Sequence, residues 1–210
     1  NTRPHLWKTA DYGKTWKSLA AAMPKGVYLH AVREDPKRKG LLYAGTERGV
    51  AYSPDDGATW KELKLNLPTV AVHDLVVKDD DLVVGTHGRS IWILDDLTAL
   101  REWSKDVEAS AAHLFTARPA VRWRYDGPIS SQVKGPGQNP PVGAVLQYWL
   151  KDEPTGDVVL EILDEKGGLV RKLSSRKIQP ETPPDDPDAA EDENAKKALP
   201  KRAGLQRAVW

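Results

Sequence analysis

The sequence contains one eight-residue pattern twice, as Thr9-Ala-Asp11-Tyr-Gly13-Lys-Thr15-Trp16 and as Ser53-Pro-Asp55-Asp-Gly57-Ala-Thr59-Trp60. The copies begin 44 positions apart, and the similarity continues beyond them, because residues 23–24 correspond to residues 67–68 and residues 42–46 to residues 82–86. A repeat of about 40–45 residues has the length of one four-stranded propeller blade. The repeat therefore predicts that residues 1–103 form about two and a half blades of a β-propeller.

Each residue type in the pattern has a structural role. The aspartate is expected to accept hydrogen bonds from backbone N–H groups of its own turn. The glycine allows a positive φ without a Cβ clash. The threonine begins the outgoing strand, and the tryptophan is expected to bury its ring between neighbouring sheets. We interpret the following positions as structural: Thr9, Asp11, Gly13, Thr15, Trp16, Ser53, Asp55, Gly57, Thr59 and Trp60.

The segments around these turns are typical of short antiparallel strands. Apolar runs bounded by Gly, Pro and Asp predict strands at residues 29–33, 41–45, 50–53, 60–63, 72–78, 81–85 and 90–94. Helical periodicity is confined to residues 97–112, which can hold a turn or two. The last blade has three predicted strands, and we find no fourth before Leu114.

The doubled motif resembles the Asp-box, or bacterial neuraminidase repeat, of sialidases, other glycoside hydrolases and sortilin-type propellers. Residues 83–96 resemble the final-blade signature of large bacterial sortilin-like repeat proteins. The resemblance covers residues 5–103 and implies that the remainder of a longer propeller chain completes the ring. It implies a fold and leaves the activity open, because fold and function are separable.

The second half of the chain reads as a different module. Residues 104–143 are rich in Gly and Pro towards their end and are predicted to be a linker. Strands are predicted at residues 144–150, 158–163, 169–173 and 204–210, with an acidic, Pro-rich insertion at 179–200. The pattern resembles the immunoglobulin-like or fibronectin type III-like sandwich that follows the propeller in the same bacterial family. We therefore predict an all-β chain in which partial propeller blades precede a partial β-sandwich.

Composition excludes several classes of protein. The net charge of +1 gives no electrostatic case for nucleic acid binding. The absence of cysteine removes disulfides, thiol catalysis and zinc–thiolate sites. No apolar run approaches the roughly 20 residues of a membrane-spanning helix. We expect no cofactor and no metal. Because the chain opens at Asn1 and Trp210 falls within a predicted strand, we expect a piece of a longer protein. The family resemblance implies that the full-length protein is secreted or periplasmic.

Four residues are candidates for ligand binding. His30 and His73 occupy equivalent positions near the start of the innermost strand of each blade, where side chains approach the central channel. His87 and Arg89 lie in the next turn, where loops on a rigid scaffold often carry function. The alternatives are semi-buried histidines set by repeat geometry, and a turn stabilised by its own hydrogen bonds. These residues favour a binding or scaffold module whose ligand is a peptide or a glycan.

The alternative is a fragment of a glycoside hydrolase, sialidase-like or related, with its catalytic residues mostly in other blades. Such an enzyme needs two carboxyl groups about 5–9.5 Å apart, or an arginine cluster beside a tyrosine nucleophile. No such pair stands out in the sequence, so we assign no catalytic residue. A third reading is a propeller that assists the assembly of partner proteins.

Overall fold

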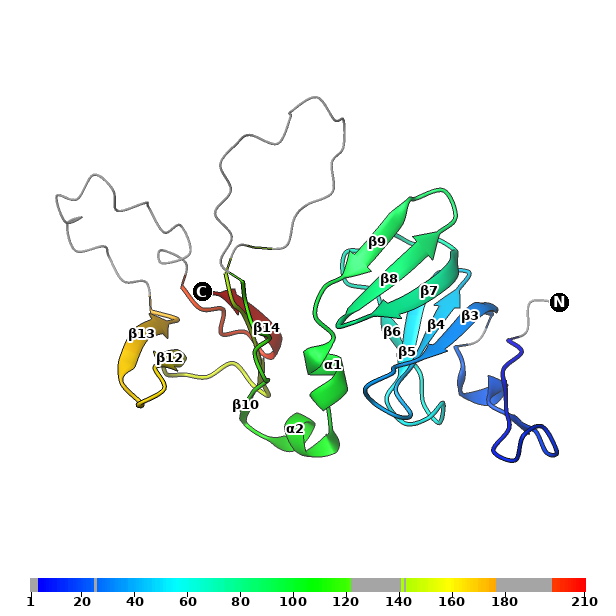
Figure 1. Ribbon diagram of the computed structural model, residues 1–210, viewed down its shortest axis with the longest axis horizontal. Helices are drawn as coiled ribbons and strands as arrows, with labels where there is room; N and C mark the ends of the chain where they lie inside the picture. The colour runs from blue at the N-terminus through cyan, green and yellow to red at the C-terminus, as the bar shows by residue number, and fades with distance from the viewer. Residues whose placement is uncertain (1–3, 25, 122–140, 142, 177–197) are drawn as a thin grey trace, which may run out of the picture. The chain divides into compact units, whose positions relative to one another are not determined.

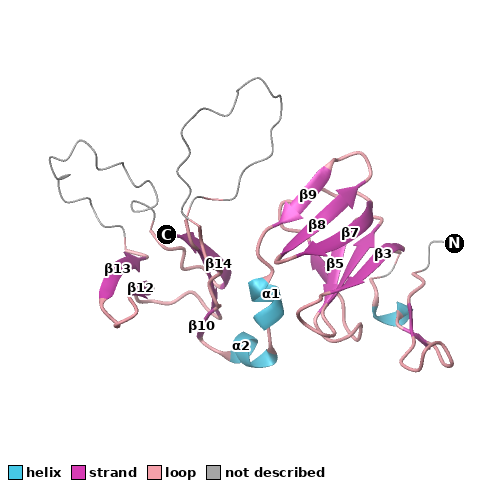
Figure 2. Cartoon of the chain, in the orientation of Figure 1, coloured by secondary structure: helices cyan, strands magenta, loops and turns pink. Residues whose placement is uncertain are grey.

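The computed structural model describes residues 4–24, 26–121, 141, 143–176 and 198–210. The described chain is mostly β, with several antiparallel sheets and a few short helices (Figure 2). Its contacts divide it into two units, Asn1–Trp103 and Ser104–Trp210. The described strands and helices agree with every predicted strand to within one residue at each end, and with the predicted helical region.

The first unit contains three sheets whose strands follow chain order (Figure 1). A small two-stranded sheet is formed by β1 (Trp7–Lys8) and β2 (Lys17–Ser18), and the 3₁₀ turn η1 (Ala20–Ala22) follows it. The four-stranded sheet comprises β3 (Leu29–Glu34), β4 (Leu42–Thr46), β5 (Gly49–Ser53) and β6 (Lys61–Leu63). The three-stranded sheet comprises β7 (Val72–Lys78), β8 (Asp81–Thr86) and β9 (Ile91–Leu94), and helix α1 (Thr98–Glu102) comes next.

The sequence repeat corresponds to a structural repeat. Strands β3, β4 and β5 are equivalent to β7, β8 and β9, and β1 and β2 are equivalent to β5 and β6. The pairing register shifts between Leu29 and Ala31 in one sheet and between Val72 and Asp74 in the other. The first strand of each sheet therefore has an irregularity at the same place.

The four-stranded and three-stranded sheets pack together through an apolar core. Its buried members are Leu41, Tyr43, Val50, Val72, Leu75, Leu82, Val84 and Leu97. Burying each large side chain of this kind contributes about 1.5–3 kcal/mol. A glycine is required at Gly45, because a Cβ there would lie 2.6 Å from the carbonyl oxygen of Val72. The glycine lets the backbones of the two sheets approach closely.

Helix α1 is attached to both sheets by Arg101. The guanidinium Nε lies 3.0 Å from both carboxylate oxygens of Asp35, which follows β3, and Nη1 pairs with Asp80, which follows β7. Tyr43 also donates a hydrogen bond to Asp35, at 3.2 Å. Asp35 is 3% exposed, so its charge is satisfied almost entirely by these partners. Arg101 thus joins the equivalent turns of the two sheets.

The second unit contains a three-stranded and a two-stranded sheet. Strand β11 (Val145–Leu150) lies between β10 (Ala112–Leu114) and β14 (Gly204–Val209). Strands β12 (Val159–Leu163) and β13 (Leu169–Ser174) form the predicted hairpin. Helix α2 (Lys105–Ala109) precedes β10, and the Ser104 hydroxyl caps it by accepting the Val107 N–H.

The structure corrects three sequence predictions. The predicted linker, residues 104–143, includes α2 and β10, and β10 joins a sheet by pairing with β11. Most of the predicted insertion, residues 179–200, lies outside the described residues, but Leu199 is buried and donates its N–H to the Ser174 carbonyl at 3.0 Å. The prediction that both pattern tryptophans are buried is wrong for Trp16, which is 58% exposed because its sheet has only two described strands. Trp60 is half-buried.

Candidate binding site at the inner strands

The sheet irregularities position His30 and His73. In each sheet the strand pairing skips the histidine where the register shifts. Neither histidine therefore has a partner in the regular pairing of its strand with the next one. The turn that follows the second strand is held beside it in both sheets, because Glu47 donates its N–H to the Tyr28 carbonyl at 3.2 Å and His87 donates to the Ala71 carbonyl at 2.8 Å. The repeat therefore brings a histidine of the first strand and one turn residue together in each sheet.

The three candidate histidines meet across the two sheets. The ring centroids of His30 and His73 are 4.5 Å apart, and those of His73 and His87 are 4.8 Å apart. Tyr28 contacts His30 edge-on at 5.1 Å. We call Tyr28, His30, Glu47, His73 and His87 the imidazole cluster. His73 and His87 are exposed, so the cluster is open to solvent at that end.

Glu47 orders one end of the imidazole cluster. Its Oε2 lies 3.1 Å from Nε2 of His30, and its carboxylate also accepts a hydrogen bond from the Tyr28 hydroxyl. The bonds from Tyr28 and His30 lower the pKa of Glu47, and the same carboxylate raises the pKa of Tyr28. Glu47 is therefore ionised at neutral pH, and Nε2 of His30 carries the shared proton. Nδ1 of a neutral His30 is then a hydrogen-bond acceptor.

Arg89 lies in the same turn as His87 and contributes to it through its backbone. Its N–H donates to the Thr86 hydroxyl at 3.2 Å, and its carbonyl accepts the indole N–H of Trp92 at 2.8 Å. The Arg89 side chain is exposed. The contacts of Arg89 match the turn-stabilising alternative, and the structure does not bring its guanidinium into the imidazole cluster.

A cavity of about 340 Å³ opens beside the turn that carries Glu47. Its wall includes the cations Arg48 and Lys64, neither of which makes an ion pair with a described residue. The Glu62 carboxylate and the hydroxyl-bearing residues Thr46 and Thr69 line the same cavity. This cavity offers charged and polar groups beside the turn that carries Glu47, and no residue of the imidazole cluster is part of its wall.

The sequence analysis assigned no binding role to Tyr28, Glu47, Arg48 or Lys64. The repeat held a signal for Glu47, because it aligns with His87 at the same turn position. No such signal marked Tyr28, whose repeat equivalent is Ala71. Its proximity to Glu47 depends on the backbone bond that holds the turn against the inner strand.

The two Asp-containing turns have the same hydrogen bonds. Oδ1 of Asp11 accepts the Thr15 N–H at 2.8 Å, and Oδ2 accepts the Thr15 hydroxyl at 2.6 Å. Asp55 makes the same two bonds with Thr59, also at 2.8 and 2.6 Å. In each turn the glycine N–H donates to the leading hydroxyl at 2.8 Å, that of Thr9 or of Ser53. Gly13 and Gly57 have φ of 89° and 84°, so both turns use the left-handed region.

Among the described residues, no group of three or more histidine, aspartate or glutamate side chains is placed to hold a metal ion. No helix within the described part of the chain is long and apolar enough to cross a membrane. In comparisons with known proteins, no family model matches the sequence, and no curated protein shows significant similarity to it.

Proposed function

We propose that the chain is the binding or scaffold part of an Asp-box β-propeller protein, and that its ligand is a peptide or a glycan held at the imidazole cluster. The observation that carries the proposal is the convergence of His30, His73 and His87. Two of these residues are repeat equivalents on neighbouring sheets. A side-chain group built across a repeat interface is a recurrent place for ligands, because rigid elements fix its geometry.

The chemistry of the cluster supports binding. Its open end presents imidazole nitrogens that can donate or accept hydrogen bonds. The cavity beside the Glu47 turn adds the cations Arg48 and Lys64, which make no ion pair with a described residue, and it is large enough for one side chain or one sugar ring. Glu47, the carboxylate of the cluster, is already engaged by Tyr28 and His30.

The same proposal interprets the sheets as blades. The sheet β3–β6 is then one complete blade, β7–β9 the inner part of the next, and β1–β2 the outer half of the one before. Three observations support this interpretation of the sheets: the shared register irregularity, the shared turn geometry and the apolar core between the two larger sheets. The second unit is interpreted as part of an immunoglobulin-like or fibronectin type III-like sandwich. Two antiparallel sheets with one strand drawn from the predicted linker support this interpretation.

The glycoside hydrolase alternative has no specific observation in its favour. The carboxylates of Asp11 and Asp55 are used within their turns, and Asp35 and Asp80 are used by Arg101. These four carboxylates therefore have structural hydrogen bonds or ion pairs.

Binding of peptide and glycan libraries to the purified chain tests the proposal. Replacing His73 by Ala removes the central ring of the cluster and is expected to weaken a selected ligand about 3- to 10-fold, because one ring contact contributes about 0.5–1.5 kcal/mol. The matched control is His5→Ala, an exposed histidine outside the cluster. Equal loss in both variants, or no selected ligand from either library, would overturn the proposal.

A further inference from the structure

Strand β9 is the open edge of the three-stranded sheet. Its repeat equivalent, β5, pairs with β4 on one side and with β6 on the other. Among the described residues, β9 pairs with β8 alone. The four-stranded sheet thus shows which kind of element occupies this edge: a short antiparallel strand.

The edge lacks the features that usually protect such strands. Ile91–Leu94 contains no charged residue and no proline, both of which natural edges use to prevent pairing. Ile91 and Ile93 are 69% and 58% exposed. Their equivalents in the four-stranded sheet, Val50 and Tyr52, are buried and half-buried.

The hydrogen-bond pattern shows which backbone groups are available. The Ser90 carbonyl accepts the Thr86 N–H at 3.3 Å, which directs the backbone groups of Ser90 towards β8. Because direction alternates along an antiparallel strand, Trp92 and Leu94 also turn theirs towards β8. Ile91 and Ile93 therefore direct their N–H and C=O groups outwards.

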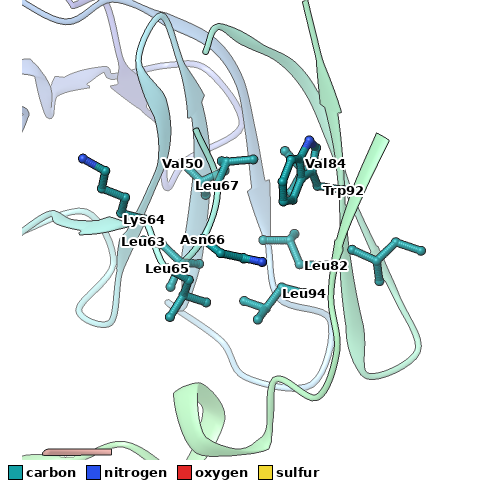
Figure 3. A pocket seen from close by; sticks show the side chains of 11 residues that line it. Val50, Leu63, Lys64, Leu65, Asn66, Leu67, Leu82, Val84, Trp92 and Leu94 are labelled. Atoms are coloured by element: carbon teal, nitrogen blue, oxygen red, sulfur yellow. The ribbon is translucent and has the colours of Figure 1, made fainter. Parts of the chain in front are cut away.

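An apolar pocket of about 50 Å³ lies beside this edge, between the two sheets (Figure 3). Trp92 and Leu94 of β9 form one side, and residues 63–67, which begin in β6, form the opposite side. In the four-stranded sheet, Glu62 of β6 lies opposite Ala51, the equivalent of Trp92. Directly opposed residues project from the same face of a sheet. A residue added opposite Trp92 would therefore direct its side chain to the face that borders the pocket.

We propose that β9 is a strand-binding site, and that its partner is an extended polypeptide segment that pairs antiparallel to Ile91–Leu94 and places an apolar side chain opposite Trp92. The backbone groups of Ile91 and Ile93 supply the hydrogen bonds. The pocket at Trp92 selects the side chain, as alternate pockets do in other cases of strand addition. This site is independent of the imidazole cluster and of the ligand proposed for it.

The β6 sequence itself supplies the probe for a test. A synthetic peptide of residues 58–65 carries the strand that pairs with β5, and a second peptide replaces its Glu62 by Leu to suit the pocket at Trp92. Each peptide is titrated into the isotope-labelled chain while amide exchange is followed by NMR. We expect slowed exchange at the amides of Ile91 and Ile93. We expect the Glu62→Leu peptide to bind about tenfold more tightly, because it buries one leucine side chain.

Three variants of the chain separate pairing from pocket selection. Ile93→Pro removes an outward N–H, is tolerated at an edge strand and should abolish binding of both peptides. Ile91→Thr keeps its N–H and should bind both peptides within about threefold of the original chain. Leu65→Glu, at a pocket residue that is 68% exposed, should erase the preference for the leucine peptide even if the proline variant fails to fold.

Two outcomes would overturn the proposal. One is the absence of slowed exchange at Ile91 and Ile93 with either peptide. The other is protection of the same amides without peptide in a dimer detected by sedimentation, because a second copy of the chain would then occupy the edge.

Discussion

Glu47 connects two members of the imidazole cluster, Tyr28 and His30. Tyr28 and His30 both donate to its carboxylate, and both bonds lower its pKa. An ionised Glu47 keeps the proton of His30 on Nε2, which leaves Nδ1 as an acceptor in the neutral ring. A ligand bound as proposed would meet an imidazole of fixed tautomer at His30 and two further exposed imidazoles at His73 and His87.

The Tyr28→Phe substitution tests this arrangement at a single side chain. It removes the hydrogen bond that most lowers the pKa of Glu47, so that pKa should rise towards its ordinary value. Titration of the Glu47 carboxyl carbon by NMR measures the change. Tyr12→Phe is the matched control, because Tyr12 is fully exposed and should leave Glu47 unchanged. An unchanged Glu47 pKa in the Tyr28 variant would contradict the assignment.

The Asp55→Ala substitution tests the turn. It removes both acceptors of Thr59 and should lower the free energy of unfolding by about 1–3 kcal/mol, because it leaves a turn N–H without its partner. Denaturant unfolding followed by circular dichroism measures the loss. Glu62→Ala removes a nearby exposed carboxylate and should change stability by less than about 0.5 kcal/mol. Similar losses in the two variants would remove the special role of Asp55.

At the scale of elements, the sequence predicts the strands and turns that depend on local patterns. It does not predict the features that depend on contacts between distant segments. The strands of the four-stranded and three-stranded sheets were predictable, because apolar runs are bounded there by turn residues and the repeat places Asp11 and Asp55 in the same position relative to Gly and Trp. Strands β1 and β2 were not predicted. Strand β10 was assigned to a linker, because its three residues become a strand only by pairing with β11, which is distant in sequence. The meeting of the histidines required the sheet irregularity and the packing of two sheets, which no local pattern encodes.

The attachment of α1 is an element-scale feature that a substitution can isolate. Arg101→Ala leaves the buried carboxylate of Asp35 without its cation and should reduce the free energy of unfolding by about 3–5 kcal/mol. Arg33→Ala removes the exposed ion pair with Asp74 and should cost less than about 1 kcal/mol. Thermal unfolding of both variants provides the comparison. Equal losses would show that Arg101 does not hold the two sheets through α1.

At the scale of the whole molecule, the two units differ in the sequence pattern that predicts their strands. The first unit was predicted from its repeat, whereas the second followed from alternation within single strands such as β12 and β13. Its sheet β10–β11–β14 joins strands separated by long stretches of chain, and such pairings cannot be read from local alternation. The sequence therefore specifies the strands of the second unit better than their arrangement.

The carboxylates of the first unit predict a specific response to acid. Hydrogen bonds from Thr59 lower the pKa of Asp55 against the opposing effect of its burial, and the bonds from Lys37 and Arg101 lower that of Asp80. A carboxylate with a lowered folded-state pKa stabilises the fold above its unfolded pKa, and that stability disappears as the pH falls through the folded value. The free energy of unfolding of the first unit should therefore be steady near neutral pH and decline from about pH 5 towards pH 2.

Amide exchange of Leu75 and Val84, measured along a pH series and corrected for intrinsic rates, reports on this unit alone. The double variant Asp55→Asn, Asp80→Asn should start less stable and decline less steeply, and an equally steep decline would show that other groups cause the acid sensitivity.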